Sequence, residues 1–468
     1  MSTSIPTWNY DERFYAALTE GSNVYIKTDP VKGKGLFARR PMKTGDAALC
    51  ETAMSCTQNL DDALSRIPVC GMCLVSLESP RDIVSRVASR RKNLIGGDVP
   101  FGGVYRARST IRCRFADEGC PMVFCSTRCL EHAWRSFHFA GCRGRMDESS
   151  RSALDQFMSA SWMQGGIDYS DTHFLALRMV CDAVTKHRLH RLPLDAAYIS
   201  IGQLIKAPIE KFHFSFLLRD DEDHGKISEG EKKKKYWETF VKYKEEPTMD
   251  PAVIRANKEG PTKDDMLDRG ISLLRSIFVF NGEEEQYFNR QRWSELLGAV
   301  LLNGQERSPF SPYTEFTEMV SRISPAASEE LRAFHKRLRS MGIDHRKFSS
   351  GSRGQGIYAV GCLFNHSCLP NLQVLYSSEN DETLTAVCLR DIAADEELCI
   401  SYIQEDSPYR ERQQQLFEHY LFTCRCTKCL QEADEDVEAE MPGTMGSELA
   451  PQPGETSEKH VDPTTEAN

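Results

Sequence analysis

The chain has 468 residues, 40% hydrophobic and 27% charged, a composition typical of a globular protein of about two or three domains. No apolar run approaches the roughly 20 residues that a membrane-spanning helix needs. The first ten residues lack the basic flank and apolar core of a signal peptide. We therefore expect a protein inside the cell that has no membrane span.

The formal net charge of −10 is unevenly distributed. Of 58 Lys and Arg and 68 Asp and Glu, one base and eleven acids lie in residues 430–468, so residues 1–429 hold 57 of each sign. That C-terminal segment is also rich in Pro, Gly, Ser and Thr and poor in aromatic residues, which is the composition of disordered chains. We predict a neutral body followed by an acidic disordered tail.

The pattern of residues 24–38 predicts a short strand, Val24–Lys27, followed by a loop. The loop contains two glycines one residue apart, Gly33 and Gly35. Glycine permits positive φ and lets another group approach the backbone closely. Both an ordinary turn and a ligand-binding loop are compatible with this pattern.

Residues 70–142 contain seven cysteines and His138 at metal-ligand spacings. Seventeen cysteines in a reducing compartment favour metal ligation over disulfides, and the alternative is that they are small buried hydrophobes. Eight ligands equal two tetrahedral zinc sites, and two ions holding alternating pairs could support a module with little hydrophobic core. The interleaved assignment gives one ion Cys70, Cys73, Cys125 and Cys129, and the other Cys113, Cys120, His138 and Cys142. Residues 74–112 are predicted to be an inserted loop.

Residues 150–342 change to helical periodicity, with apolar residues recurring at i, i+3, i+4 and i+7. A further helix is predicted from Ser324-Pro325 to near Gly342. The run Lys232–Lys235 is interpreted as a solvated helix face, with a nuclear-import patch as the alternative. The predicted buried faces are Leu154, Phe157, Met158 and Trp162, then Phe174, Leu177, Cys181 and Val184, and then Trp293, Leu296, Leu297, Val300 and Leu301.

Strand patterns return after residue 356, and the second and third strands are predicted to form a hairpin. A second cysteine group, Cys424, Cys426 and Cys429, is one thiol short of a tetrahedral zinc site. Cys368, inside the polar turn Asn365–Asn371, is the candidate fourth ligand. The predicted strands are Ile357–Phe364, Leu372–Tyr376, Leu384–Leu389 and Glu397–Ile403.

Five segments together resemble the SET-and-MYND family of lysine methyltransferases, in which a SET domain carries an inserted MYND zinc finger. The segments are Gly33–Ala38, the eight finger ligands, Asn365–Asn371, Glu396–Tyr402 and Tyr420–Cys429. Asp395 stands where the family commonly has glycine. Within the family, the chain most resembles the short members that end in an acidic tail.

The resemblance implies an α+β fold: a split SET β-fold with an inserted MYND zinc finger, a helical insert, a post-SET zinc site and the disordered tail. The implied domains are the N-terminal part of the SET domain (22–69), the finger with its internal loop (70–142), the helical insert (143–342), the core SET domain (343–404), the post-SET zinc segment (405–430) and the acidic tail (431–468).

The resemblance further implies methyl transfer from S-adenosylmethionine to a lysine of a histone or another basic protein, with three structural zinc ions. Tyr402 is the implied residue beside the transferring methyl, and Tyr420 and Phe348 are implied to line the lysine channel. For His366, a core histidine bonded to backbone carbonyls is the alternative. The implied donor-binding residues are Lys32, Gly33, Lys34, Gly35, Leu36, Leu363, Asn365, His366, Tyr402 and Phe422, and the third zinc ligands are Cys368, Cys424, Cys426 and Cys429.

The rival hypothesis is a non-catalytic adaptor in which the finger binds proline-rich peptides and the SET fold is a scaffold. We expect a monomer in nucleus and cytoplasm whose substrate is a protein with a basic, lysine-containing segment. Direct nucleic-acid binding is disfavoured because residues 70–142 lack an obvious recognition helix.

Overall fold

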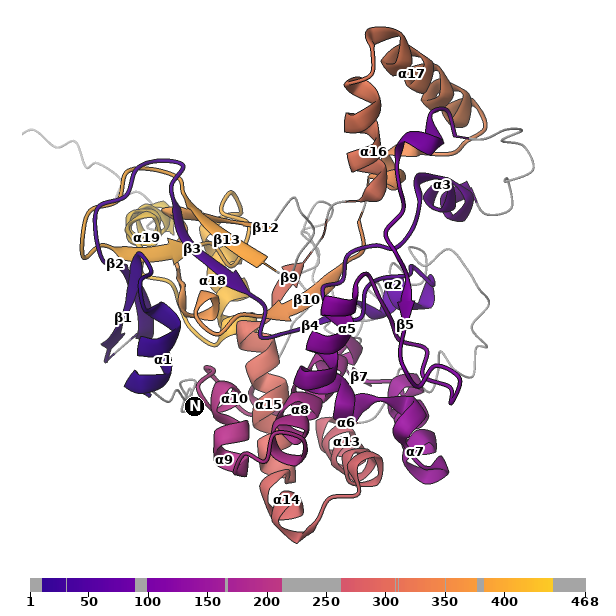
Figure 1. Cartoon of the computed structure of the whole chain (residues 1–468). Coiled ribbons are helices and arrows are strands. Elements are labelled where there is room, and N and C mark those ends of the chain that lie inside the picture. Colours follow the sequence, from indigo (N-terminus) through magenta and orange to yellow (C-terminus); the bar gives the residue numbers. More distant parts are fainter. Residues whose placement is uncertain are drawn as a thin grey trace, which may run out of the picture.

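The computed structural model describes residues 11–30, 32–88, 99–164, 167–212, 262–307, 309, 311–349, 351–376 and 383–440. Figure 1 shows a β-rich part at the upper left, a helical part below it, and a smaller group of helices at the upper right. The lysine run Lys232–Lys235 and the predicted hairpin turn at 377–382 lie outside the described residues. Within the described ranges, no helix is long and apolar enough to cross a membrane.

The β-rich part is assembled from both ends of the chain. β1 (Val24–Asp29) and β2 (Gly33–Ala38) form an antiparallel hairpin, so the predicted loop residues belong largely to a strand. β2 also pairs with β14 (Glu397–Ile400), which in turn pairs in parallel with β11 (Asn365–His366). The indigo N-terminal and yellow-orange C-terminal segments accordingly lie side by side in Figure 1.

Two three-stranded sheets complete this part, in the orders β4-β10-β9 and β12-β13-β3. The predicted hairpin is confirmed, because β12 pairs antiparallel with β13. The bounds are β3 (Ala47–Thr52), β4 (Ser55–Gln58), β9 (Gln305–Arg307), β10 (Gly354–Ile357), β12 (Leu372–Tyr376) and β13 (Thr383–Cys388).

The predicted strand Ile357–Phe364 is wrong beyond Ile357, where the chain turns into the short helix η7 (Gly361–Leu363). The carboxylate of Glu51 accepts hydrogen bonds from the backbone N–H groups of Val360 (2.9 Å) and Gly361 (2.6 Å). These donors are therefore satisfied without a neighbouring strand, which permits the turn.

The helical part packs against the sheets and the cysteine-rich segment in one continuous core. The predicted faces are buried or partly buried there, with one error: Met158 is 46% exposed because its helix buries Ala153 and Phe157 instead. The helices of this part are α7 (Glu148–Ser159), α8 (Ser170–Arg188), α9 (Leu194–Ala197), α10 (Ile199–Gly202), α13 (Lys263–Phe278), α14 (Gly282–Tyr287) and α15 (Arg290–Asn303), and shorter helices elsewhere are α1 (Glu12–Thr19) and α2 (Leu60–Leu64).

The third part has its own hydrophobic cluster, which we call the satellite core. It joins α16 (Pro312–Ser321) and α17 (Pro325–Ser340) to α3 (Pro80–Ala88). The predicted start of α17 is confirmed, since the Ser324 hydroxyl caps the helix by accepting from the backbone N–H of Ala327. The prediction of a plain loop at 74–112 is wrong for α3, whose apolar face packs into the satellite core.

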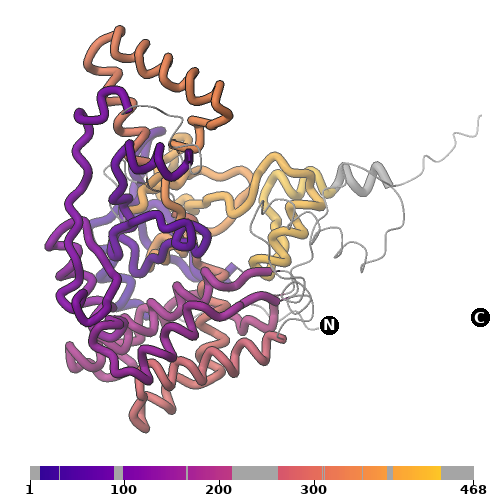
Figure 2. The backbone as a smooth tube through the Cα atoms, turned by 90° about the vertical axis from the view of Figure 1, so that its right-hand side faces the viewer, coloured from indigo at the N-terminus to yellow at the C-terminus, as the bar shows by residue number. Residues whose placement is uncertain are grey.

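Two helices end the described chain, α18 (Tyr409–Tyr420) and α19 (Thr427–Glu440). They form the yellow segment on the right of Figure 2, at the side of the molecule away from the cysteine-rich segment. Residues 431–440 belong to α19, so these ten residues are helical and not part of a disordered tail. Residues 441–468 lie outside the described residues.

Candidate functional site

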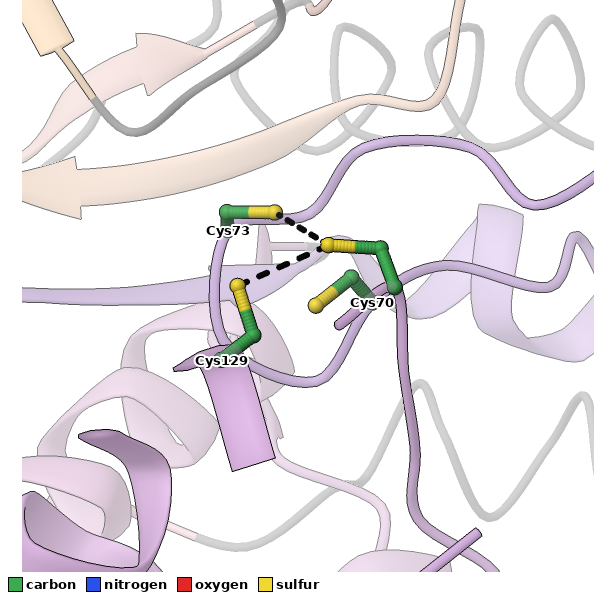
Figure 3. Close-up of side chains that lie close together, drawn as sticks. Cys70, Cys73 and Cys129 are labelled. Atoms are coloured by element: carbon green, nitrogen blue, oxygen red, sulfur yellow. Dashed lines mark hydrogen bonds between the residues drawn. The ribbon is translucent and has the colours of Figure 1, made fainter. Parts of the chain in front are cut away.

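Three groups of four side chains each bring their ligand atoms within 4.8 Å of one another. Cys125 Sγ lies 3.7 Å from Cys73 Sγ and 3.5 Å from Cys129 Sγ, and Figure 3 shows the labelled Cys70, Cys73 and Cys129 converging. Tetrahedral Zn–S bonds of about 2.3 Å place sulfurs about 3.8 Å apart, whereas a disulfide needs about 2.05 Å. The groups are Cys70, Cys73, Cys125 and Cys129, then Cys113, Cys120, His138 and Cys142, and then Cys368, Cys424, Cys426 and Cys429.

The second group joins the hairpin of β5 (Ile111–Arg112) and β6 (Val123–Phe124) to the helical turn η3 (Trp134–His138). His138 Nε2 lies 3.2 Å from Cys113 Sγ, and Cys113 Sγ lies 3.7 Å from Cys142 Sγ. The structure therefore brings together the same two sets of four side chains that the interleaved assignment predicts. All three groups have the ligand number and separations that zinc requires.

An aromatic cluster lies where β14 and α18 end. The Tyr402 ring is 4.8 Å from Tyr420, 5.3 Å from His366 and 6.4 Å from Phe422, measured between centroids. The Tyr402 hydroxyl donates to the carbonyl oxygen of Phe364. Desolvation around this hydroxyl raises the pKa of Tyr402 above its ordinary value, so the group stays protonated at neutral pH.

A cavity of about 670 Å³ opens on one side of Tyr402 and is also lined by Tyr420 and Phe364. Its other walls come from β9, β12 and the end of α15. The described residues that line it include two carboxylates, Glu306 and Glu405, and neither lysine nor arginine. The lining therefore suits a positively charged side chain.

Several of the predicted donor-binding residues lie together around Glu397, outside the cavity. Asn365 Nδ2 donates to Glu397 Oε1 (2.8 Å), and Lys32 Nζ donates to Glu397 Oε2 (2.7 Å), so one carboxylate joins the β1–β2 turn to the Asn365 strand. Gly33 has φ +79°, a conformation that favours glycine. None of these residues lines the cavity, whereas Tyr402 lines it and also bonds His366.

Two further predicted donor-side residues, Lys34 and Leu363, are buried. The side chain of Lys34 points away, with Nζ donating to the hydroxyl of Tyr15 (2.9 Å) and to the carbonyl of Gln203. Burial lowers the pKa of Lys34 to about 8. Leu363 is 1% exposed in η7, so it and Lys34 can offer a ligand only backbone or apolar contact.

The His366 ring cannot serve as the predicted hydrogen-bonding donor ligand. The backbone N–H of Tyr402 donates to Nδ1 (3.0 Å), which places the ring proton on Nε2, 3.3 Å from Cys368 Sγ. Burial lowers the pKa of His366 to about 4, so the ring is neutral. Both ring nitrogens therefore have hydrogen-bond partners within the protein, as in the core-histidine alternative. The partners are a backbone amide and a thiol, whereas that alternative expected backbone carbonyls.

The predicted channel role of Phe348 is contradicted. Phe348 is fully buried in the satellite core, with its ring 4.9 Å from Tyr313, and it belongs to a different hydrophobic cluster from Tyr402 and Tyr420. Its position six residues before the strand β10 gives no indication of this separate core.

Phe348→Ala should therefore destabilise the satellite core without altering substrate binding. Truncating a buried phenylalanine costs about 3–5 kcal/mol in unfolding free energy. Chemical denaturation should show this loss, while KM for the folded protein stays unchanged. If Phe348→Ala instead raised KM without loss of unfolding free energy, Phe348 would line the lysine channel after all.

Three residues that shape the site and its surroundings are not predicted from the sequence: Glu397, Glu51 and Asn303. Asn303 is 3% exposed, lines the cavity and donates to the carbonyls of Ile205 and Ala299, both at 2.6 Å. Its Oδ1 has no partner among the described residues. The paired acids at 396–397 were a visible signal for Glu397, whereas Asn303 lies in an ordinary helical pattern.

Gly35→Ala should weaken donor binding. A Cβ at Gly35 would lie 2.7 Å from Asn365 Nδ2, so the amide would have to leave Glu397 Oε1. We expect roughly a tenfold rise in the donor Kd, the loss of about one hydrogen bond to a charged group. Calorimetric titration with S-adenosylmethionine measures this. The control is Gly282→Ala, because the Cβ position of Gly282 is open. Gly45→Ala is unsuitable, because Gly45 has φ +87°, where any side chain would be strained.

The SET domain family model matches residues 33–403 of the chain. The protein-lysine N-trimethyltransferase SMYD5 of Gallus gallus is 24% identical over 92% of this chain and 90% of its own length. The histone-lysine N-methyltransferase ATXR2 of Arabidopsis thaliana is 27% identical over 67% of this chain and 62% of its own length. A SET and MYND domain-containing protein of Dictyostelium discoideum is 42% identical over 21% of this chain and 19% of its own length. The chain therefore belongs to the SET domain family and, within it, to the SET-and-MYND proteins.

Proposed function

We propose that the protein is a protein-lysine N-methyltransferase that uses S-adenosylmethionine as its methyl donor. The observation that carries the proposal is the position of Tyr402, which lines an acidic cavity on one side and bonds the His366 strand on the other. A lysine side chain entering the cavity would therefore meet the donor beside Tyr402. The similarity to lysine methyltransferases over most of the chain supports this chemistry.

The cavity residues address the main chemical difficulty, which is that lysine is protonated at neutral pH. Deprotonating a lysine of pKa about 10.4 at pH 7 costs roughly 4.6 kcal/mol in water. Glu306 and Glu405 attract the incoming ammonium, and the rings of Tyr402 and Tyr420 then surround it with apolar surface. Desolvation by these rings favours the neutral amine, and the confined site aligns it for in-line attack.

The residues on the other side of Tyr402 fit S-adenosylmethionine. When bound, this donor supplies an electrophilic methyl group on a positively charged sulfur. The backbone of Lys32–Leu36 and the Oδ1 of Asn365 would hold its amino-acid end, and the Phe422 ring would stack on the adenine. The absence of a side chain at Gly35 beside the Asn365 amide supports this arrangement.

We also propose three structural zinc ions, one in each group of four ligands. The two finger ions would hold residues 70–142, and the third would tie Cys368 to the segment after α18. We retain the proposed division into a split SET domain (22–69 and 343–404), finger, helical insert and post-SET segment. The satellite core supports one refinement: the segment from Tyr313 to Phe348 forms a separate unit with α3, which belongs to the finger's internal segment.

The decisive experiment is incubation of the purified protein with radiolabelled S-adenosylmethionine and a mixture of basic proteins, including histones. We expect label on lysine, identified as methyllysine after acid hydrolysis. Absence of labelled lysine from every protein offered would refute the proposal for this substrate class.

A thermal-shift titration with S-adenosylmethionine discriminates the enzyme from the adaptor. A ligand that binds only the native state raises the melting temperature, by an amount that grows with its concentration. The enzyme predicts such a rise, whereas the adaptor predicts none. Glu397→Gln, which weakens the contact to Lys32, should reduce the rise and serves as the matched variant.

A further inference from the structure

Arg412 lies beside the third group of cysteines and is only 1% exposed. It lies on α18, and each of its three guanidinium nitrogens donates at least one hydrogen bond. Nε–H donates to Cys368 Sγ (3.3 Å), Nη2–H donates to Cys429 Sγ (3.7 Å) and to Glu432, and Nη1–H donates to the carbonyl of Ser407 (2.6 Å). Two of the four sulfurs of the group are thus in contact with one permanent cation.

The charges explain why a buried arginine is tolerated here. Four thiolates around one divalent ion leave a net charge of about −2, and an arginine reduces it to about −1. A buried guanidinium without partners would carry a large desolvation cost, which Glu432 and the hydrogen bonds to two sulfurs and the Ser407 carbonyl offset. The N–H···S hydrogen bonds also fix the positions of the two sulfurs that would hold the ion.

The same sulfur connects Arg412 to the aromatic cluster. Cys368 Sγ accepts a second hydrogen bond from His366 Nε2 (3.3 Å). The other nitrogen of that ring accepts from the backbone N–H of Tyr402 (3.0 Å). A continuous chain of contacts therefore runs from α18 through the metal-ligand group to the residue that lines the cavity.

We propose that Arg412 is a positioning residue that strengthens zinc binding at the third site by holding the sulfurs of Cys368 and Cys429 and that, through Cys368 and His366, fixes the backbone of Tyr402. Arg412 does not line the cavity. The effect on zinc stands independently of catalysis, and only the effect on Tyr402 rests on the proposed function.

The test compares Arg412→Met and Arg412→Lys with Arg410→Met, an exposed position on the same helix. Zinc release to a colorimetric chelator is followed in the full-length protein. In Arg412→Met we expect one zinc of three to be bound about 10- to 100-fold more weakly, with the two finger ions unaffected. The zinc affinity of Arg412→Lys should lie between those of the wild type and Arg412→Met, because an ammonium group can donate a hydrogen bond to one of the two sulfurs. Release that matches wild type, or faster release of all three ions alike, would overturn the proposal.

Cobalt substitution supplies a readout that a merely structural arginine would not move. The sulfur-to-cobalt charge-transfer absorption depends on hydrogen bonds to sulfur, so its energy should shift in Arg412→Met and not in Arg410→Met. An unshifted band in Arg412→Met would overturn the proposal. If the wild type methylates no lysine yet these zinc and cobalt results appear, the proposed function fails and the role of Arg412 at the metal stands.

Discussion

Tyr402→Phe should reduce the rate of lysine methylation about 100-fold or more, while the protein stays folded. The substitution removes only the hydroxyl, which donates to the Phe364 carbonyl at the wall of the cavity. Losing one preorganised polar group at a reacting centre typically costs about 10²–10³ in kcat. Single-turnover rates with radiolabelled donor measure the effect separately from product release.

The matched control for this change is Tyr313→Phe. Tyr313 also has a buried ring and a bonded hydroxyl, 2.9 Å from His335 Nε2, but it lies in the satellite core. We expect its methylation rate to equal that of the wild type. If Tyr402→Phe methylates as fast as Tyr313→Phe, the catalytic assignment of Tyr402 is wrong.

Cys368→Ala should have the second large effect, because it removes one zinc ligand and the hydrogen-bond acceptor of His366 at once. We expect the metal content to fall from three zinc ions per chain to two. S-adenosylmethionine binding should be lost in parallel, since Asn365, a predicted donor-binding residue, lies three residues before Cys368 in the same turn. Elemental analysis and calorimetric titration measure the two quantities.

Cys50→Ala is the control, because Cys50 is exposed and belongs to none of the three groups. It should keep three zinc ions and full donor affinity. Retention of three ions in Cys368→Ala would show that Cys368 is no ligand, and loss of zinc with intact donor affinity would show that the metal site and the donor site are independent.

The metal-ligand groups could be predicted from the sequence because zinc sites use few residue types, Cys and His, in sets of four. Even Cys113, separated from Cys120 by an unusual spacing, was assigned to its group by counting alone. The strands β12 and β13 were similarly predictable, since alternating apolar residues mark a half-buried strand. Asp395 is instructive: it adopts φ +62° where the family commonly has glycine, and its carboxylate accepts from the Tyr25 hydroxyl at 2.6 Å.

The errors share a cause, which is that the deciding partner lies far away in sequence. Glu51 turns the chain at Val360, about 310 residues later, and no local pattern near Val360 indicates it. Phe348 packs with Ile83 in the satellite core. The sequence patterns predict neither a helix nor a strand for either of these two segments. The ring of His366 is occupied by a sulfur and a backbone amide whose positions depend on the finished fold.

The pairing of Phe37 with Glu397 has a consequence for synthesis of the protein. A ribosome adding about 5–20 residues per second exposes β2 roughly 20 to 70 seconds before β14 emerges. Throughout that interval the edge of the β1–β2 hairpin presents unpaired backbone groups. Until β14 is synthesised, that edge is therefore a site at which the nascent chain can pair with other chains.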